Sequence, residues 1–322
     1  MALPRVAYSK PHLTYEKQAD LLASRGLTID SRPQALLQLK RIGYYRLSGY
    51  LYPFRQLTVG NQPQYDSEYR QSTFVAGSRF SDAVQLYWFD IGLRSLAFSA
   101  VGSLELELRA RVAYSLGALD PFGYETPGPI DTSTTKRLKN FARWDSSATK
   151  SVRQSKRTDY MKHFTAKYTQ QTPPIWMLVE TLDFGGLTSL YSVMNQGLQS
   201  QLSSGFGVAQ GSLFEDWLQN LRDVRNTAAH HSRLWNARLN FSIGSASRIH
   251  PDLKHLQNLP GHKVYSSLAL LQYFFRSAGI QSQFPAQVKS LMAKFPSPQN
   301  GAVSIEKDMG FPVAWTALPL WA

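Results

Sequence analysis

The chain has 322 residues, 43% of them hydrophobic, a formal net charge of +13 and no cysteine. This length can bury a sizeable core and allows one to three domains. The lack of cysteine excludes disulfides and thiolate chemistry. The sequence contains no run of about 18 apolar residues, so we expect no membrane-spanning helix. The first residues lack the apolar segment of a signal peptide, so we expect a cytoplasmic protein with no membrane partner. The positive charge predicts a polyanionic partner, most simply nucleic acid.

The N-terminal quarter predicts short helices followed by an aromatic cluster. Thr14 is an N-cap candidate for a helix ending near residue 25, with Gly26 at its C′ position. A Ser and Pro start signal predicts a second helix to residue 42. Residues 44–55 then contain a cluster of aromatic residues interleaved with arginines. We interpret these tyrosines as core residues with polar tips, with base stacking as the alternative.

Residues 78–117 carry apolar side chains at three- and four-residue steps and predict a strongly helical region. It is long enough for two helices or for one long, kinked helix, with Gly92 and Gly102 as its weak points. Glu105 and Arg109 form an i, i+4 pair. We interpret it as a structural ion pair. The alternative is that Glu105 orients an active-site Arg or His.

A basic segment follows a Pro- and Gly-containing loop at residues 120–135. Residues 136–167 contain ten lysines and arginines against two aspartates. We interpret the segment as a surface that follows RNA phosphates, and a solvated, partly disordered loop is the alternative. The residues assigned to RNA binding here are Lys136, Arg137, Lys139, Arg143, Arg153, Lys156 and Arg157.

After a break at Pro173 and Pro174, residues 175–193 predict an apolar helix, within which Gly185 and Gly186 indicate close packing or a kink. Residues 196–210 are polar and are expected to be a connector. Helical patterns recur near residues 263–277 and 285–295. Phe311, Trp315 and Trp321 are the expected packing anchors of the C-terminal tail.

Strand alternation is sparse, so the predicted class is mainly α. We expect an N-terminal helical region at residues 1–72 and a core at residues 73–245, with the basic insertion at about 120–172. Residues 246–322 would form C-terminal helices and a tail that pack on this core.

The stretch at residues 212–238 contains the strongest functional pattern. Ser212 and Glu215 have capping-box spacing, which predicts a helix start. Arg222, Asn226 and His230 then follow at i, i+4 and i+8 and form one polar strip. An apolar stripe completes the helix: Phe214, Trp217, Leu218, Leu221, Val224 and Ala228.

Arg225 lies roughly 140° around the helix axis from His230, so one helix does not place the two side chains together. A second copy related by a two-fold axis could bring the Arg of one chain to the His of the other. An imidazole can move protons, a guanidinium can hold charge on a phosphorane, and RNA supplies its own 2′-hydroxyl nucleophile. The pair is therefore sufficient for metal-free RNA transesterification. The alternative is that His230 and His231 cap the helix and Arg225 is a solvated surface group.

The segment from Arg225 to His230 resembles the R-x4-6-H motif of HEPN ribonucleases, and the longer string RNTAAHHSRLWN resembles Abi-like proteins of the AbiD and AbiF group. Residues 10–27, 39–55, 173–191 and 309–321 resemble further blocks of that family, in order along the chain. The resemblance implies a HEPN-like bundle of long antiparallel helices with N-terminal and C-terminal helical additions. It also implies a homodimer with a composite site and a role in phage defence, with an RNA or protein antitoxin as a possible further partner.

In the function that this resemblance implies, the protein is a metal-independent endoribonuclease without a cofactor. His230 would be the general base, Arg225 would stabilise the pentacoordinate phosphate, and Asn226 would hydrogen-bond His230 or a phosphate oxygen. His231 also satisfies the spacing, as R-x5-H, and is the alternative base. Arg222 is assigned to RNA binding, as is Arg233, which could instead bind the C-terminal carbonyls of the helix.

Two other functions remain open from the sequence. A non-catalytic RNA-binding or guard module would use the same positive surface, but binding would survive the loss of the histidine. A metal hydrolase based on His230 and His231 is disfavoured, because adjacent histidines point about 100° apart on a helix and no carboxylate-rich cluster accompanies them.

Overall fold

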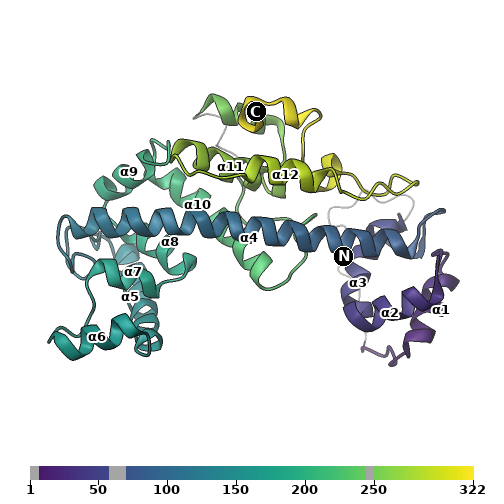
Figure 1. Cartoon of the computed structure of the whole chain (residues 1–322), viewed down its shortest axis with the longest axis horizontal. Helices are drawn as coiled ribbons and strands as arrows, with labels where there is room; N and C mark the ends of the chain where they lie inside the picture. Colours follow the sequence, from purple (N-terminus) through teal and green to yellow (C-terminus); the bar gives the residue numbers. More distant parts are fainter. Residues whose placement is uncertain (1–6, 58–69, 244–249) are drawn as a thin grey trace. The chain divides into compact units, whose positions relative to one another are not determined.

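The computed structural model describes residues 7–57, 70–243 and 250–322 (Figure 1). Of the residues that the structure describes, 63% are helical and 4% are in strands, which confirms the predicted mainly α class. Among the described residues, no helix is both long and apolar enough to cross a bilayer. The described residues form two compact units: the first comprises residues up to Ile91 together with Ala293–Lys307, and the second comprises Gly92–Met292 and Asp308–Ala322. The three sequence-derived regions stay a prediction.

The first unit begins with three short helices and a small antiparallel hairpin. Thr14 accepts a hydrogen bond from the Lys17 backbone N–H, and Gly26 has a φ of 89°, so the predicted N-cap and C′ glycine are confirmed. Tyr50 is buried and donates to Asp90, whereas Tyr45 is exposed, so the core interpretation holds for only part of the aromatic cluster. The elements are α1 (Tyr15–Ser24), α2 (Arg32–Ile42), α3 (Tyr44–Leu51), η1 (Tyr52–Phe54), β1 (Arg55–Leu57) and β2 (Arg70–Phe74).

Helix α4 (Phe80–Gly117) is one continuous helix of 38 residues, which decides between the two alternatives that the sequence left open. A Cβ at Gly92 would lie 3.0 Å from the Cδ1 atom of Leu291, so a larger residue there would require that leucine side chain to shift. Gly102 has open space around it, so the helix tolerates it without such a contact.

The second unit contains the remaining helices (Figure 1). Helix α10 packs against α8, α9 and α11, and α5 packs against α7 and α8. The elements are α5 (Thr135–Ser155), α6 (Asp159–Lys167), α7 (Ile175–Thr181), α8 (Phe184–Val193), α9 (Gln196–Ser204), α10 (Gly211–Ala229), η4 (Pro251–Asn258), α11 (Val264–Ser277), α12 (Phe284–Met292), η6 (Trp315–Ala317) and η7 (Pro319–Trp321). A short π-helix, η5 (Ile305–Met309), lies at the junction of the two units in sequence.

Two predictions on this part of the chain are wrong. The single helix expected at residues 175–193 is two helices, because the Asp183 side chain accepts a hydrogen bond from the Gly186 N–H and so starts α8. The polar connector expected at residues 196–210 contains α9, whose N-cap is Asn195. In both places a short polar side chain begins a new helix.

The core of the second unit is aromatic and lies around α10 and α11. Phe214 stacks on Phe206, and Phe274 meets both rings edge-on. Trp321 packs near Tyr265 and donates to its hydroxyl. Phe311 and Trp315 are also buried, so the three predicted anchors of the tail are confirmed.

Candidate functional site

The start of α10 is fixed by tertiary packing. The helix begins at Gly211 after Gln210, which makes no side-chain cap hydrogen bond, so the capping box predicted at Ser212 is wrong. A Cβ at Gly211 would lie 2.9 Å from the Cβ of Gln199. The hydroxyl of Tyr191 donates to the Gly211 carbonyl at 2.9 Å. Close contact with these neighbours places the N-cap at Gln210, two residues before the Ser212 that the local sequence indicates.

All six residues of the predicted apolar stripe of α10 are buried, so that prediction is confirmed. Asn220 is also fully buried, although it was not among the predicted core residues. Its Nδ2 donates to the carbonyl of Phe241, and its Oδ1 accepts from Ser267 Oγ at 2.6 Å. The signal was present, because Asn220 lies three residues after Trp217 and four before Val224 on the buried stripe. It links α10 to α11.

The C-terminal end of α10 places the two histidines in different backbone conformations. His230 is the C-cap, with φ −85°, and its N–H donates to the Asn226 carbonyl at 2.9 Å. His231 has a φ of 55°, in the left-handed region. The Ser232 N–H donates to the Thr227 carbonyl and the His231 N–H to that of Ala228, which together form a Schellman motif. Both histidine side chains are exposed.

Arg225 and Asn226 lie in contact one turn before this end. The Arg225 Nη1 donates to Asn226 Oδ1 at 3.2 Å, and the Arg225 guanidinium lies 5.7 Å from the ring centroid of Phe98 on α4. The structure gives no hydrogen bond between the side chains of Asn226 and His230 among the described residues. Asn226 therefore positions the guanidinium directly, and His230 lies separately at the helix end.

An acidic group of α4 lies near this arginine. Burial raises the pKa of Glu105, and the positive charges of Arg109 and Arg225 oppose that rise. Glu105 accepts from Arg109 at 2.7 Å, and Arg109 also donates to the Leu182 carbonyl at 2.7 Å. The pair thus has the predicted structural role, and it also puts a negative charge within electrostatic reach of Arg225.

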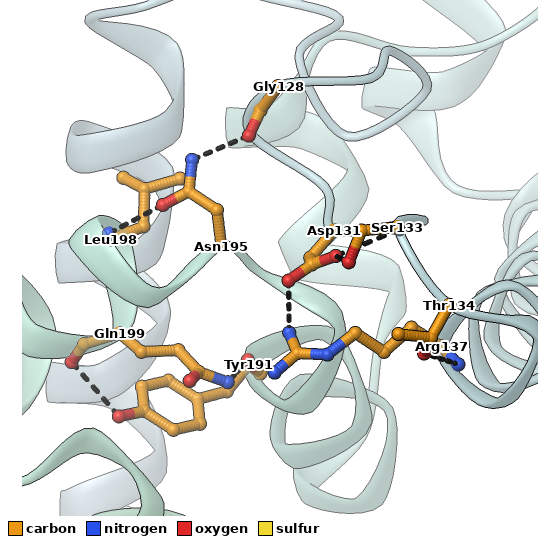
Figure 2. Close-up of polar contacts among 9 residues, drawn as sticks. All are labelled: Gly128, Asp131, Ser133, Thr134, Arg137, Tyr191, Asn195, Leu198 and Gln199. Carbon is orange, nitrogen blue, oxygen red and sulfur yellow. Dashed lines mark hydrogen bonds and ion pairs between the residues drawn. The ribbon is translucent and has the colours of Figure 1, made fainter.

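The basic segment is folded, so the alternative of a partly disordered loop is wrong. Lys136, Lys139, Arg143 and Arg153 extend from α5 into solvent, and Lys156 and Arg157 follow at its end, also exposed. Arg137 differs from the rest because it pairs with Asp131, as Figure 2 shows. Asp131 also accepts from the Ser133 hydroxyl, so this pairing fastens the loop before α5.

The residues assigned on α10 and just after it do not form a single cluster. Arg225, Asn226 and His230 lie along the last turn and the cap of α10, while Arg222 lies one turn earlier and shares a cavity with Arg143 of α5. Arg233 is half-buried in the segment that follows the cap. Within the described part of the chain, no three His, Asp or Glu side chains are placed to hold a metal ion.

Comparison with known proteins gives one family. The model of the Abi-like protein family matches residues 37–236, a span that includes all of α10 and both histidines. No curated protein and no solved structure gives a significant match. Because the matched span is more than half of the chain, this protein belongs to the Abi-like protein family.

Proposed function

We propose that this protein is a metal-independent endoribonuclease of the HEPN type, which acts in the cytoplasm as part of an abortive-infection defence against phage. The observation that carries the proposal is the end of α10. There Arg225 is held by Asn226, and an exposed imidazole follows at the helix cap. Membership of the Abi-like family supports the defence role.

In this mechanism the RNA supplies its 2′-hydroxyl as the nucleophile. His230 accepts the hydroxyl proton as the oxygen attacks phosphorus, and the bond to the 5′-oxygen breaks. That oxygen takes a proton as it leaves, so the products are a 2′,3′-cyclic phosphate and a 5′-hydroxyl. The guanidinium of Arg225 stabilises the charge that develops on the pentacoordinate phosphate. Asn226 acts as a positioning residue through its hydrogen bond to Arg225.

The site is completed by a second copy of the chain. An exposed strip of small and apolar residues runs along α4 beside Arg225, and it includes Ser95, Ser99, Leu106 and Ala110. Phe98, which contacts the Arg225 guanidinium, is 45% exposed at the edge of this strip. A two-fold axis here would bring Arg225 of one copy toward His230 of the other.

The exposed lysines and arginines of α5 supply affinity for RNA without sequence preference. This folded basic helix also favours the second candidate, a guard module that binds RNA without cutting it. An RNA or protein antitoxin would then bind the same surface and restrain the protein. Cleavage distinguishes the two functions, because only the nuclease requires His230.

The test is cleavage of a mixed RNA pool in excess EDTA by the native protein and by the variants Arg225→Ala, His230→Ala and His231→Ala. We expect cyclic-phosphate ends from the native protein and from His231→Ala. Cleavage should fall by about 100-fold or more in the other two variants, since each loses a group that acts in the transition state.

RNA binding without cleavage in every form would reject the nuclease and favour the guard. Cleavage that EDTA abolishes would establish a metal-dependent reaction instead. In both cases a gel-shift measurement on the same samples shows that the protein still binds RNA.

A further inference from the structure

A cavity of about 420 Å³ lies between α5, α8 and α10, in the second unit. Neither Arg225 nor His230 lines it, so it is separate from the proposed reacting groups. Arg222, which does line it, lies one helical turn before Asn226. The volume falls within the roughly 300–1,000 Å³ range of small-molecule pockets.

Small residues of α8 create the space. Gly185, Gly186, Ser189 and Ser192 follow one another at steps of one, three and three residues, so they form a strip along one face of that helix. A Cβ at Gly185 would lie 3.7 Å from the Cδ atom of Arg222. A large side chain on this strip would therefore fill the gap between α5 and α10.

The walls of the cavity carry charges of both signs. Arg143 approaches from α5 and Arg222 from α10, and the structure shows no ion pair for either guanidinium among the described residues. Glu215 and Gln219 complete the α10 wall, because residues at i, i+4 and i+7 share one helix face.

The carboxyl group of Glu215 has little hydrogen bonding within the protein. Within the described residues its one hydrogen bond is a long contact of 3.5 Å from Gln219 Nε2 to Oε1. Burial raises the pKa of Glu215, Asp216 adds to the rise, and Arg137 and Lys136 oppose it. A half-buried acceptor of this kind favours a ligand that brings two adjacent N–H groups.

Among the four RNA bases, only guanine presents two neighbouring N–H donors on its pairing edge, with a carbonyl oxygen beside them. A carboxylate can accept from both donors, and Arg is the usual partner of guanine O6. Proteins that recognise single-stranded RNA contact these edges on unpaired bases.

We propose that this cavity binds an unpaired guanine of the RNA. Glu215 accepts from the N1–H and the 2-amino group, Arg222 donates to O6, and Arg143, at the exposed rim, binds the phosphate of the same nucleotide. This inference rests on the proposed function, because it names a recognition site for the RNA that the protein cuts.

The test is isothermal titration calorimetry of GMP, AMP, CMP and UMP with the full-length His230→Ala variant, which separates binding from cleavage. We expect GMP to bind at least about tenfold more tightly than the others, since one bidentate base contact discriminates to that extent or more. Glu215→Gln in the same background should lose this preference. Asp216→Asn is the matched control, because it makes the same change on an adjacent α10 residue outside the cavity, and it should keep the preference.

Two further variants keep the result interpretable. Arg143→Ala should weaken all four nucleotides by a similar factor, and Ser189→Phe should abolish binding by filling the floor of the cavity, with circular dichroism as the check on folding. Equal affinity for the four nucleotides, or a GMP preference that survives Glu215→Gln, would overturn the proposal. GMP selectivity in a protein whose native form cuts no RNA would refute the nuclease and leave this site standing.

Discussion

His231 adopts a left-handed backbone conformation that is unfavourable for residues other than glycine. It has a φ of 55° and occupies the C′ position of α10, where glycine is the preferred residue. For an L-residue the left-handed conformation costs about 1–2 kcal/mol. A non-glycine residue here could be retained for a function of its imidazole, or simply tolerated by the surrounding structure. The neighbouring His230 has a negative φ of −85° and does not carry this left-handed cost.

Replacing His231 with glycine separates these two roles. We expect His231→Gly to raise the free energy of unfolding by about 1 kcal/mol, because the strain is relieved, and to leave cleavage within a few-fold of native if His230 is the base. Chemical denaturation and the EDTA cleavage assay measure the two effects. His231→Ala is the control, since alanine keeps the strained backbone and should give no such gain. A stabilised His231→Gly protein that no longer cuts RNA would assign the base to His231.

At the scale of whole helices, the sequence was informative where one period repeats over a long stretch. The apolar stripe of α10 and the helical character of α4 followed from three- and four-residue steps, but whether α4 is one helix or two did not. The start of α10 could not be predicted, because it depends on contacts of Gly211 with Gln199 and Tyr191 from other helices. The break before α8 was missed because a short cap, Asp183, interrupts a run that is apolar on both sides.

In the candidate site, too, the sequence predicted the spacing of residues along a helix but not their side-chain contacts. The order of Arg225, Asn226 and His230 along one helix followed from their spacing, but the hydrogen bond between Arg225 and Asn226 did not. Adjacent residues on an ideal helix point about 100° apart, so only the actual side-chain rotamers bring them together. The cavity shared by Arg143 and Arg222 could not be predicted either, because those residues are far apart in sequence and only the packing of α5, α8 and α10 puts them on the same cavity.

The exposed strip of α4 supports a prediction about the assembly. Leu106 is 64% exposed and lies within this strip, so Leu106→Arg would put a charge into the proposed interface. We expect the dimer to dissociate to a monomer in light-scattering measurements, and cleavage to fall at least about tenfold, because burying an unpaired charge is costly and the site needs both copies. Leu138→Arg on α5 is the control, since that leucine is also exposed, at 52%, and lies outside the strip. A Leu106→Arg protein that stays dimeric would rule out this interface.

At the scale of the whole molecule, the total charge and the placement of the charges affect the salt dependence of RNA binding in different ways. The chain carries a net charge of +13, and several exposed lysines and arginines lie close together on α5. Counterion release depends only on the phosphates that the protein contacts. Each phosphate contact to single-stranded nucleic acid makes the slope of the logarithm of the binding constant against the logarithm of the salt concentration more negative by about 0.7. A diffuse attraction would instead respond to net charge wherever it lies.

The double variant Lys139→Gln/Arg153→Gln therefore tests whether α5 touches RNA. If both side chains contact phosphates, the magnitude of the salt slope should fall by about 1.4. Lys40→Gln/Arg41→Gln makes the same change in net charge on exposed residues of α2 and should leave the slope unchanged. Fluorescence anisotropy of a labelled single-stranded RNA with the His230→Ala protein, over a range of salt concentrations, measures both slopes without cleavage. Equal losses in the two double variants would mean that net charge alone attracts the RNA and that α5 is not its binding surface.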